Sequence, residues 1–210
     1  MPPLEGSMSE LEAIAREVAS CTRCELAKTR NLTVPGEGNP AAEIMFIGEA
    51  PGWHENQQGR PFVGQAGQFL EELLRSVDLK RSDVFIANVV KCRPPQNRDP
   101  MPEEIAACRG YLERQLQVIK PKLIVTLGRY SMAKFFPAGK GIRDLHGTTC
   151  VKEGILCYAM YHPAAALHQP ALRRTIEQDM LKVPGLVEMA TASAKVEEPL
   201  EEKPAQLSLF

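Results

Sequence analysis

Four cysteines occur in two pairs whose spacing is typical of metal sites. Cys21 and Cys24 are separated by two residues, and Cys92 and Cys108 are separated by fifteen. Four thiolates can hold either a tetrahedral zinc ion or a [4Fe–4S] cluster, and the spacing alone does not choose between them. Buried, inert thiols are the alternative for any cysteine.

Three other residues offer a carboxylate, an aromatic ring and an amide that could contact a planar base. Glu49, in the segment GEAPG, places a carboxylate on a glycine-rich turn. Phe62 lies between Gly59 and Gly64, where an exposed aromatic ring could stack on a base. Asn88 ends a hydrophobic run, and its amide can both donate to and accept from an imide edge. A hydrophobic loop plug and a strand-end amide are the structural alternatives for Phe62 and Asn88.

His162 is the histidine whose context favours chemistry. It precedes Pro163 directly after a hydrophobic run. An imidazole at the rim of a sheet could stabilise negative charge that develops on a leaving group. A structural histidine is the alternative for this position.

The elements that must position these residues alternate between strands and helices. Helices are predicted at 9–20, where Ser9 and Glu12 form a capping box, and at 64–77, 102–119, 129–136 and 169–182. Strands are predicted at 43–49, 83–90, 122–128 and as a hairpin within 148–163, with Cys150 and Cys157 as structural thiols. Such alternation predicts an α/β fold with a mostly parallel sheet, in which ligands bind beyond the carboxyl ends of the strands.

Composition favours one globular domain over residues 1–185. Hydrophobic residues make up 44% of the sequence and charged residues 24%. The net charge is −1, but five of the acidic residues lie beyond residue 185, so the preceding part is mildly basic and permits DNA binding. Residues 186–205 have the composition of a disordered linker. Neither a membrane span nor a secretory signal is expected, which predicts a location in the cytoplasm, at the nucleoid if the partner is DNA. We also expect the protein to be a monomer.

Several motifs, in order, resemble the family-4 uracil-DNA glycosylases. These motifs are GEAPG with GRPFVGQAG, NVVKCRPPQNRDP, TLGRYS and YHPAAAL, and the resemblance covers residues 10–182. It implies a three-layer α/β/α uracil-DNA glycosylase fold with a central four-stranded parallel sheet. It also implies that one [4Fe–4S] cluster is ligated by the four cysteines of the two pairs: Cys21, Cys24, Cys92 and Cys108.

The resemblance further implies hydrolysis of the N-glycosidic bond of deoxyuridine in DNA, with the nucleotide flipped out of the helix. Phe62 would stack on the uracil and Asn88 would pair with its edge. His162 would stabilise charge on the departing base, and Glu49 would orient water or offset positive charge on the sugar. The backbone of three consecutive residues would line the pocket: Gly48, Glu49 and Ala50.

The position of the expected wedge residue departs from the family pattern. Glycosylases of this fold insert a leucine into the vacated base stack, four residues after the motif histidine. That position is Ala166 in this chain, and Leu167 follows it. Ala166 and Leu167 are therefore both candidates for the wedge.

The last five residues, QLSLF, resemble the motif by which bacterial proteins bind the replication sliding clamp. Gln206 would bond at the pocket rim, while Leu207, Leu209 and Phe210 would fill an apolar groove. The segment follows the predicted linker of residues 186–205. A frayed, weakly amphipathic terminus is the alternative.

Two alternatives to the glycosylase interpretation differ in their sequence requirements. A non-enzymatic iron–sulfur module that binds DNA would need the cysteines but not Glu49, Asn88 and His162 together. The related X family uses a histidine in an inserted basic loop, whereas KCRPPQNRDP contains neither a histidine nor a long insertion. The sequence therefore favours a DNA-repair hydrolase.

Overall fold

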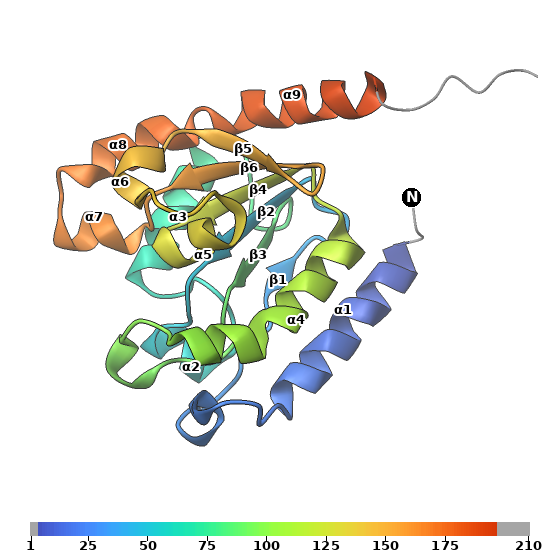
Figure 1. The fold of residues 1–210 in the computed structure, drawn as a ribbon, viewed down its shortest axis with the longest axis vertical. Coiled ribbons are helices and arrows are strands. Elements are labelled where there is room, and N and C mark those ends of the chain that lie inside the picture. Colours follow the sequence, from blue (N-terminus) through green and yellow to red (C-terminus); the bar gives the residue numbers. More distant parts are fainter. Residues whose placement is uncertain (1–3, 197–210) are drawn as a thin grey trace, which may run out of the picture.

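The computed structural model describes residues 4–196 and shows a mixed sheet between two layers of helices (Figure 1). The sheet has six strands in the order β1-β3-β2-β4-β6-β5. Their bounds are Glu37–Gly38 (β1), Ile44–Gly48 (β2), Phe85–Asn88 (β3), Leu123–Leu127 (β4), Thr149–Lys152 (β5) and Ile155–Met160 (β6).

The four central strands are parallel, and the two edge strands run against them. β3, β2, β4 and β6 pair in parallel, whereas β1 pairs with β3 and β5 pairs with β6 in antiparallel fashion. The predicted four-stranded parallel sheet is thus the centre of a larger mixed sheet. β1 has only two residues and lies in a segment rich in glycine and proline, so no strand pattern marks it.

Nine α-helices in the described residues surround the sheet, with bounds Leu4–Ala19 (α1), Trp53–Gln58 (α2), Gln65–Arg75 (α3), Pro102–Ile119 (α4), Arg129–Phe135 (α5), Ile142–Leu145 (α6), Ala164–His168 (α7), Leu172–Met180 (α8) and Val183–Val196 (α9). Short 3-10 turns occur at Glu25–Lys28 and Pro95–Asn97. α1, α4 and α5 bury side chains in one hydrophobic cluster, and α3, α8 and α9 in the other. Of the helices in residues 4–196, none is long and apolar enough to cross a membrane.

Alternation along the strands explains the two clusters. Every residue of β2 is buried, as expected for a parallel strand covered on both faces. Met45 and Ile47 belong to the cluster under α1 and α4, whereas Ile44 and Phe46 belong to the cluster under α3 and α8. The sheet therefore separates two cores and directs its strand ends to a common edge.

Several predicted boundaries differ from the structure. α1 begins at Leu4, so Ser9 and Glu12 lie inside the helix and do not cap it. The helix predicted at 169–182 is shorter in the structure, where α8 covers Leu172–Met180. A separate short helix, α7, precedes it at Ala164–His168, with Pro170 between the two. α2 forms within a segment that was not assigned to any element.

The prediction of a disordered linker from residue 186 is wrong for its first part, because α9 continues to Val196. Leu186 and Val187 pack against the core cluster of α3 and α8. Alanine, a strong helix former, recurs in this segment. The rest of the predicted linker and the QLSLF segment lie outside the described residues.

Candidate active site and cysteine pocket

The ends of β2 and β3 bring a glycine and an amide side chain together. Gly48 and Asn88 are the last residues of these strands and are partners in the parallel register. A Cβ atom on Gly48 would lie 2.4 Å from Asn88 Oδ1 and 2.7 Å from Phe62 Cζ. Asn88 is 2% exposed, and its Oδ1 atom is the one buried side-chain N or O atom in residues 4–196 without a hydrogen-bond partner. The arrangement leaves a buried acceptor beside an aromatic ring.

The backbone of Asn88 is fixed by a buried lysine. Lys91 is 1% exposed, and its Nζ donates to the Asn88 carbonyl at 2.9 Å and to Gln115 Oε1 at 2.7 Å. The amide of Gln115 donates in turn to the carbonyl of Pro35 at 2.8 Å. Burial lowers the pKa of Lys91 to about 8. Through Lys91, Gln115 of α4 therefore supports the backbone of Asn88 at the end of β3.

His162 lies beside the ring of Phe62 and is held as a hydrogen-bond donor. The two rings are stacked, with centroids 5.4 Å apart and planes at 26°. The backbone N–H of Ala164 donates to His162 Nδ1 at 3.1 Å, which assigns the proton of the neutral ring to Nε2. Burial lowers the pKa of His162 to about 4. The imidazole is therefore neutral near pH 7 and donates through Nε2.

Glu49 and His162 both lie against Gly128. A Cβ atom on Gly128 would lie 2.5 Å from Glu49 Oε1 and 3.1 Å from His162 Cβ, and Gly128 has a φ of +94°. The backbone N–H of Tyr130 donates to Glu49 Oε1 at 3.1 Å. Burial raises the pKa of Glu49 above its ordinary value. The turn after β4 thus holds the carboxylate close to the imidazole.

Glu55 is a buried carboxylate that binds backbone and does not point at an open site. One of its oxygens accepts from the N–H groups of Val63 and Gly64, each at 2.9 Å, and the other accepts from Gly52 at 3.1 Å. Glu55 therefore connects the start of α2 to the loop that carries Phe62.

Two large apolar side chains are exposed at α2 and α7. Trp53 begins α2, is 52% exposed, and meets His54 edge to face at 4.9 Å. Leu167, in α7, is 46% exposed, whereas Ala166 is 9% exposed and packs in the core. Of the two wedge candidates, Leu167 is therefore the one that reaches solvent.

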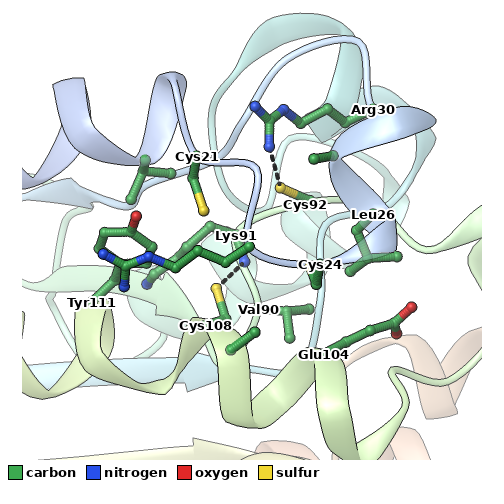
Figure 2. A pocket seen from close by; sticks show the side chains of 14 residues that line it. Cys21, Cys24, Leu26, Arg30, Val90, Lys91, Cys92, Glu104, Cys108 and Tyr111 are labelled. Carbon is green, nitrogen blue, oxygen red and sulfur yellow. Dashed lines mark hydrogen bonds between the residues drawn. The ribbon is translucent and has the colours of Figure 1, made fainter.

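The four paired cysteines line a single pocket between the end of α1, the segment after β3, and α4 (Figure 2). The backbone N–H of Lys91 donates to Cys108 Sγ at 3.3 Å, and Arg30 Nη1 donates to Cys92 Sγ at 3.4 Å. Cations and N–H donors around sulfur are the surroundings that thiolate ligands require. The chemistry of these four donors therefore suits a group bound through thiolates, although the described side chains are not arranged around one common centre.

The four cysteines of this pocket are free thiols. Burial raises the pKa of Cys92 above its ordinary value and that of Cys108 to about 11. Within residues 4–196, no group of three or more His, Cys, Asp or Glu side chains is arranged to hold a metal ion. Cys150 and Cys157 face each other across the β5–β6 hairpin as free thiols, which agrees with a structural role.

Sequence reasoning did not identify the residues that support the site. Lys91 reads as an ordinary basic residue, and only its position after the apolar run VFIANVV hints that it is buried. Gln115 lies on a helix with many polar residues, where no pattern distinguishes it. Gln115 binds the carbonyl of Pro35, and Lys91 binds the side chain of Gln115 besides the nearby carbonyl of Asn88. The contacts between distant residues leave no local motif.

Comparisons with known proteins identify the family of the chain. The sequence profile described as "Uracil DNA glycosylase superfamily" matches residues 35–182. The chain is 49% identical to the type-4 uracil-DNA glycosylase of Sulfurisphaera tokodaii over 84% of each chain. It is 42% identical to that of Thermotoga maritima over 84% of this chain and 94% of the relative. A type-5 enzyme of Thermus thermophilus is 39% identical over 47% of this chain and 52% of its own length. The chain therefore belongs to the uracil DNA glycosylase superfamily, and type-4 uracil-DNA glycosylases match it over 84% of its length at 42–49% identity.

Proposed function

We propose that this uracil-DNA glycosylase binds a flipped uracil between Asn88, Phe62 and the backbone of residues 48–50. The buried, unpaired Oδ1 of Asn88 carries this proposal, because a buried acceptor without a partner is costly unless a ligand satisfies it. Uracil offers N3–H to that oxygen and O4 to the amide nitrogen. Phe62 supplies the stacking surface beside it.

Two side chains would assist the reaction. The Nε2–H of neutral His162 donates to the oxygen of the departing base, which leaves as the C–N bond breaks with its electron pair. The Glu49 carboxylate offsets the positive charge on the sugar and orients the water that adds to it. The closeness of both residues to Gly128 supports their action in one site.

The opened helix would be held by Leu167. This leucine is exposed in the first helix after His162, so its side chain is available to replace the flipped base in the stack. The buried Ala166 is not. We further propose that the protein acts on DNA as a monomer in the cytoplasm.

Cleavage of uracil DNA is the direct test. A uracil-containing oligonucleotide is incubated with the protein and then treated with alkali, which cuts at abasic sites. Cleavage is expected, and the same oligonucleotide with thymine should remain intact. A folded protein that binds this DNA without releasing uracil would instead support the non-enzymatic module.

The four cysteines of the pocket would hold a [4Fe–4S] cluster. When bound, such a cluster would connect the end of α1 to the start of the segment after Asn88, which supports a structural role. Arg30 and the N–H of Lys91 would donate to two of the ligating sulfurs. Iron and sulfide analysis of purified protein tests the assignment, and zinc without iron would contradict it.

The QLSLF segment, outside the described residues, would bind a bacterial replication sliding clamp. Its three apolar side chains after Gln206 match the chemistry of an apolar groove: Leu207, Leu209 and Phe210. Deleting residues 206–210 should abolish co-elution with the clamp and leave uracil release unchanged. Co-elution that survives the deletion would contradict the proposal.

A further inference from the structure

The backbone of Phe62 is held in a conformation that a phenylalanine rarely adopts. Its φ is +52°, in the left-handed region that favours glycine. The side chain is nevertheless 6% exposed and stacked beside His162. A strained, buried aromatic residue keeps one orientation only where surrounding contacts enforce it.

One set of contacts holds the N–H groups that follow Phe62. Glu55 accepts from Val63 and Gly64 through one carboxylate oxygen. A second limit comes from α3, because a Cβ atom on Gly67 would lie 1.9 Å from the carbonyl oxygen of Phe62. Contacts with α2 and α3 therefore restrict the backbone of the loop that carries Phe62.

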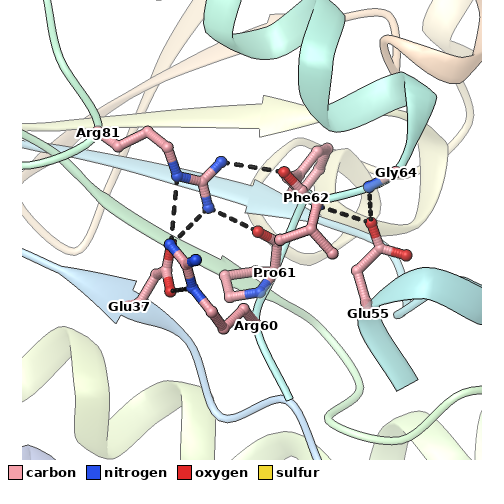
Figure 3. A network of polar contacts seen from close by, with 8 residues as sticks. Glu37, Glu55, Arg60, Pro61, Phe62, Gly64 and Arg81 are labelled. Carbon is pink, nitrogen blue, oxygen red and sulfur yellow. Dashed lines mark hydrogen bonds and ion pairs between the residues drawn. The ribbon is translucent and has the colours of Figure 1, made fainter. Parts of the chain in front are cut away.

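A second set of contacts holds the backbone carbonyl groups of Pro61 and Phe62, and Arg81 supplies it (Figure 3). Arg81 donates through Nη1 to the Phe62 carbonyl at 3.0 Å and through Nη2 to the Pro61 carbonyl at 2.6 Å. Its Nη2 and Nε also donate to Glu37 Oε1, at 2.6 and 3.2 Å. Arg60 donates to the same carboxylate, at 2.7 and 3.0 Å. The contacts to the Pro61 and Phe62 carbonyls come from Arg81 and not from Arg60.

Glu37 connects Arg81, and with it the loop that carries Phe62, to the strand that carries Asn88. It lies in β1 opposite Ile86, two residues before Asn88 in β3. Arg81 is 19% exposed and Glu37 26% exposed at their side chains, so the ion pair is partly shielded from water. The distance from the aromatic ring to the base-reading amide is thus set through Arg81 and Glu37.

We infer that Arg81, anchored by Glu37, is a positioning residue that fixes Phe62 for stacking on the base. The inference rests on the proposed role of Phe62. The guanidinium matters for its fork of donors, since a single ammonium group cannot reproduce that planar geometry on two carbonyls and a carboxylate. Arg81 acts on base binding through the loop and has no contact of its own with the base.

The test compares Arg81→Gln with Arg60→Gln as a matched control, because both arginines bind Glu37 and only Arg81 binds the loop carbonyls. The readouts are the inhibition constant of free uracil, and KM and kcat on uracil DNA. Arg81→Gln should raise the uracil inhibition constant by about tenfold or more, and Arg60→Gln by less than about twofold. Arg81→Lys should recover only part of the loss.

Two outcomes distinguish this inference from the function on which it rests. Phe62→Ala should itself weaken uracil binding, and an unchanged inhibition constant there would remove the stacking role of Phe62. If Phe62→Ala weakens binding and a folded Arg81→Gln does not, the positioning role of Arg81 is wrong. If Arg81→Gln does not fold, Glu37→Gln replaces it, because it keeps the shape of the anchor and removes its charge. The same loss of uracil affinity is then expected, and unchanged affinity would overturn the inference.

Discussion

The ammonium group of Lys91 donates to the backbone carbonyl of Asn88 across 2.9 Å, inside the protein. The same residue donates its backbone N–H to the sulfur of Cys108. One buried lysine therefore contacts both the strand end that would read the base and the pocket lined by cysteines. Disturbance of the cysteine pocket should be felt at Asn88 through this residue.

Lys91→Met should lower the free energy of unfolding by a few kcal/mol, since it leaves the Asn88 carbonyl and Gln115 Oε1 without their shared donor. Chemical denaturation measures the change. Lys140→Met is the control, because Lys140 is exposed. Equal stability of the two variants would show that the buried contacts contribute nothing.

Asn88→Ala should reduce kcat/KM on uracil DNA by at least about a hundredfold, because it removes the amide that pairs with the base. Its melting temperature should stay level or rise, since the variant also removes a buried acceptor without a partner. Thermal unfolding and single-turnover assays together separate the two effects. A large fall in stability would mean that Asn88 serves the fold and not the ligand.

The pH dependence of kcat should show an acidic limb that belongs to Glu49. Burial raises the pKa of this carboxyl, so activity that needs the carboxylate rises as pH increases through the raised value. His162, with its pKa lowered to about 4, stays neutral over the same range. In Glu49→Gln the limb should disappear and kcat should fall. A limb that persists in that variant would assign it to another group.

Gly128→Ala should reduce both stability and kcat, because its Cβ would lie 2.5 Å from Glu49 Oε1. Gly139→Ala is a matched control, since Gly139 has a similar φ of +98° and nothing within 4 Å of the added Cβ. Both variants carry backbone strain of about 1 kcal/mol or more. The excess loss in Gly128→Ala therefore measures crowding of the carboxylate, and equal losses would contradict that reading.

The strands at the centre of the sheet could be predicted because their residues are apolar throughout. The runs that contain β2 and β4 are short, buried and bounded by polar residues or glycine. The positions of these strands along the chain therefore follow from the sequence. The edge strand β1 could not be predicted, because two residues carry no periodicity. α9 was missed because its many small residues, mixed with Glu, Ser, Thr and Lys, suit a linker as well as a helix.

The candidate site divides in the same way. Glu49, Asn88 and His162 were predictable, since each follows an apolar run at the carboxyl edge of the sheet. Arg81 and Glu55 were not, because their roles depend on bonds to the backbone of a loop 8 to 20 residues away. Sequence patterns reveal which side chains end a strand, but not which distant side chain holds a loop.

Trp53 at the start of α2 gives this enzyme a built-in optical probe. The sequence contains one tryptophan, and it is half-exposed a few residues from the carboxylate at the end of β2. Its emission therefore reports on a single place in the molecule, without any attached dye. Stopped-flow mixing with DNA would follow engagement of the strand in real time, and separate it from the slower release of the base.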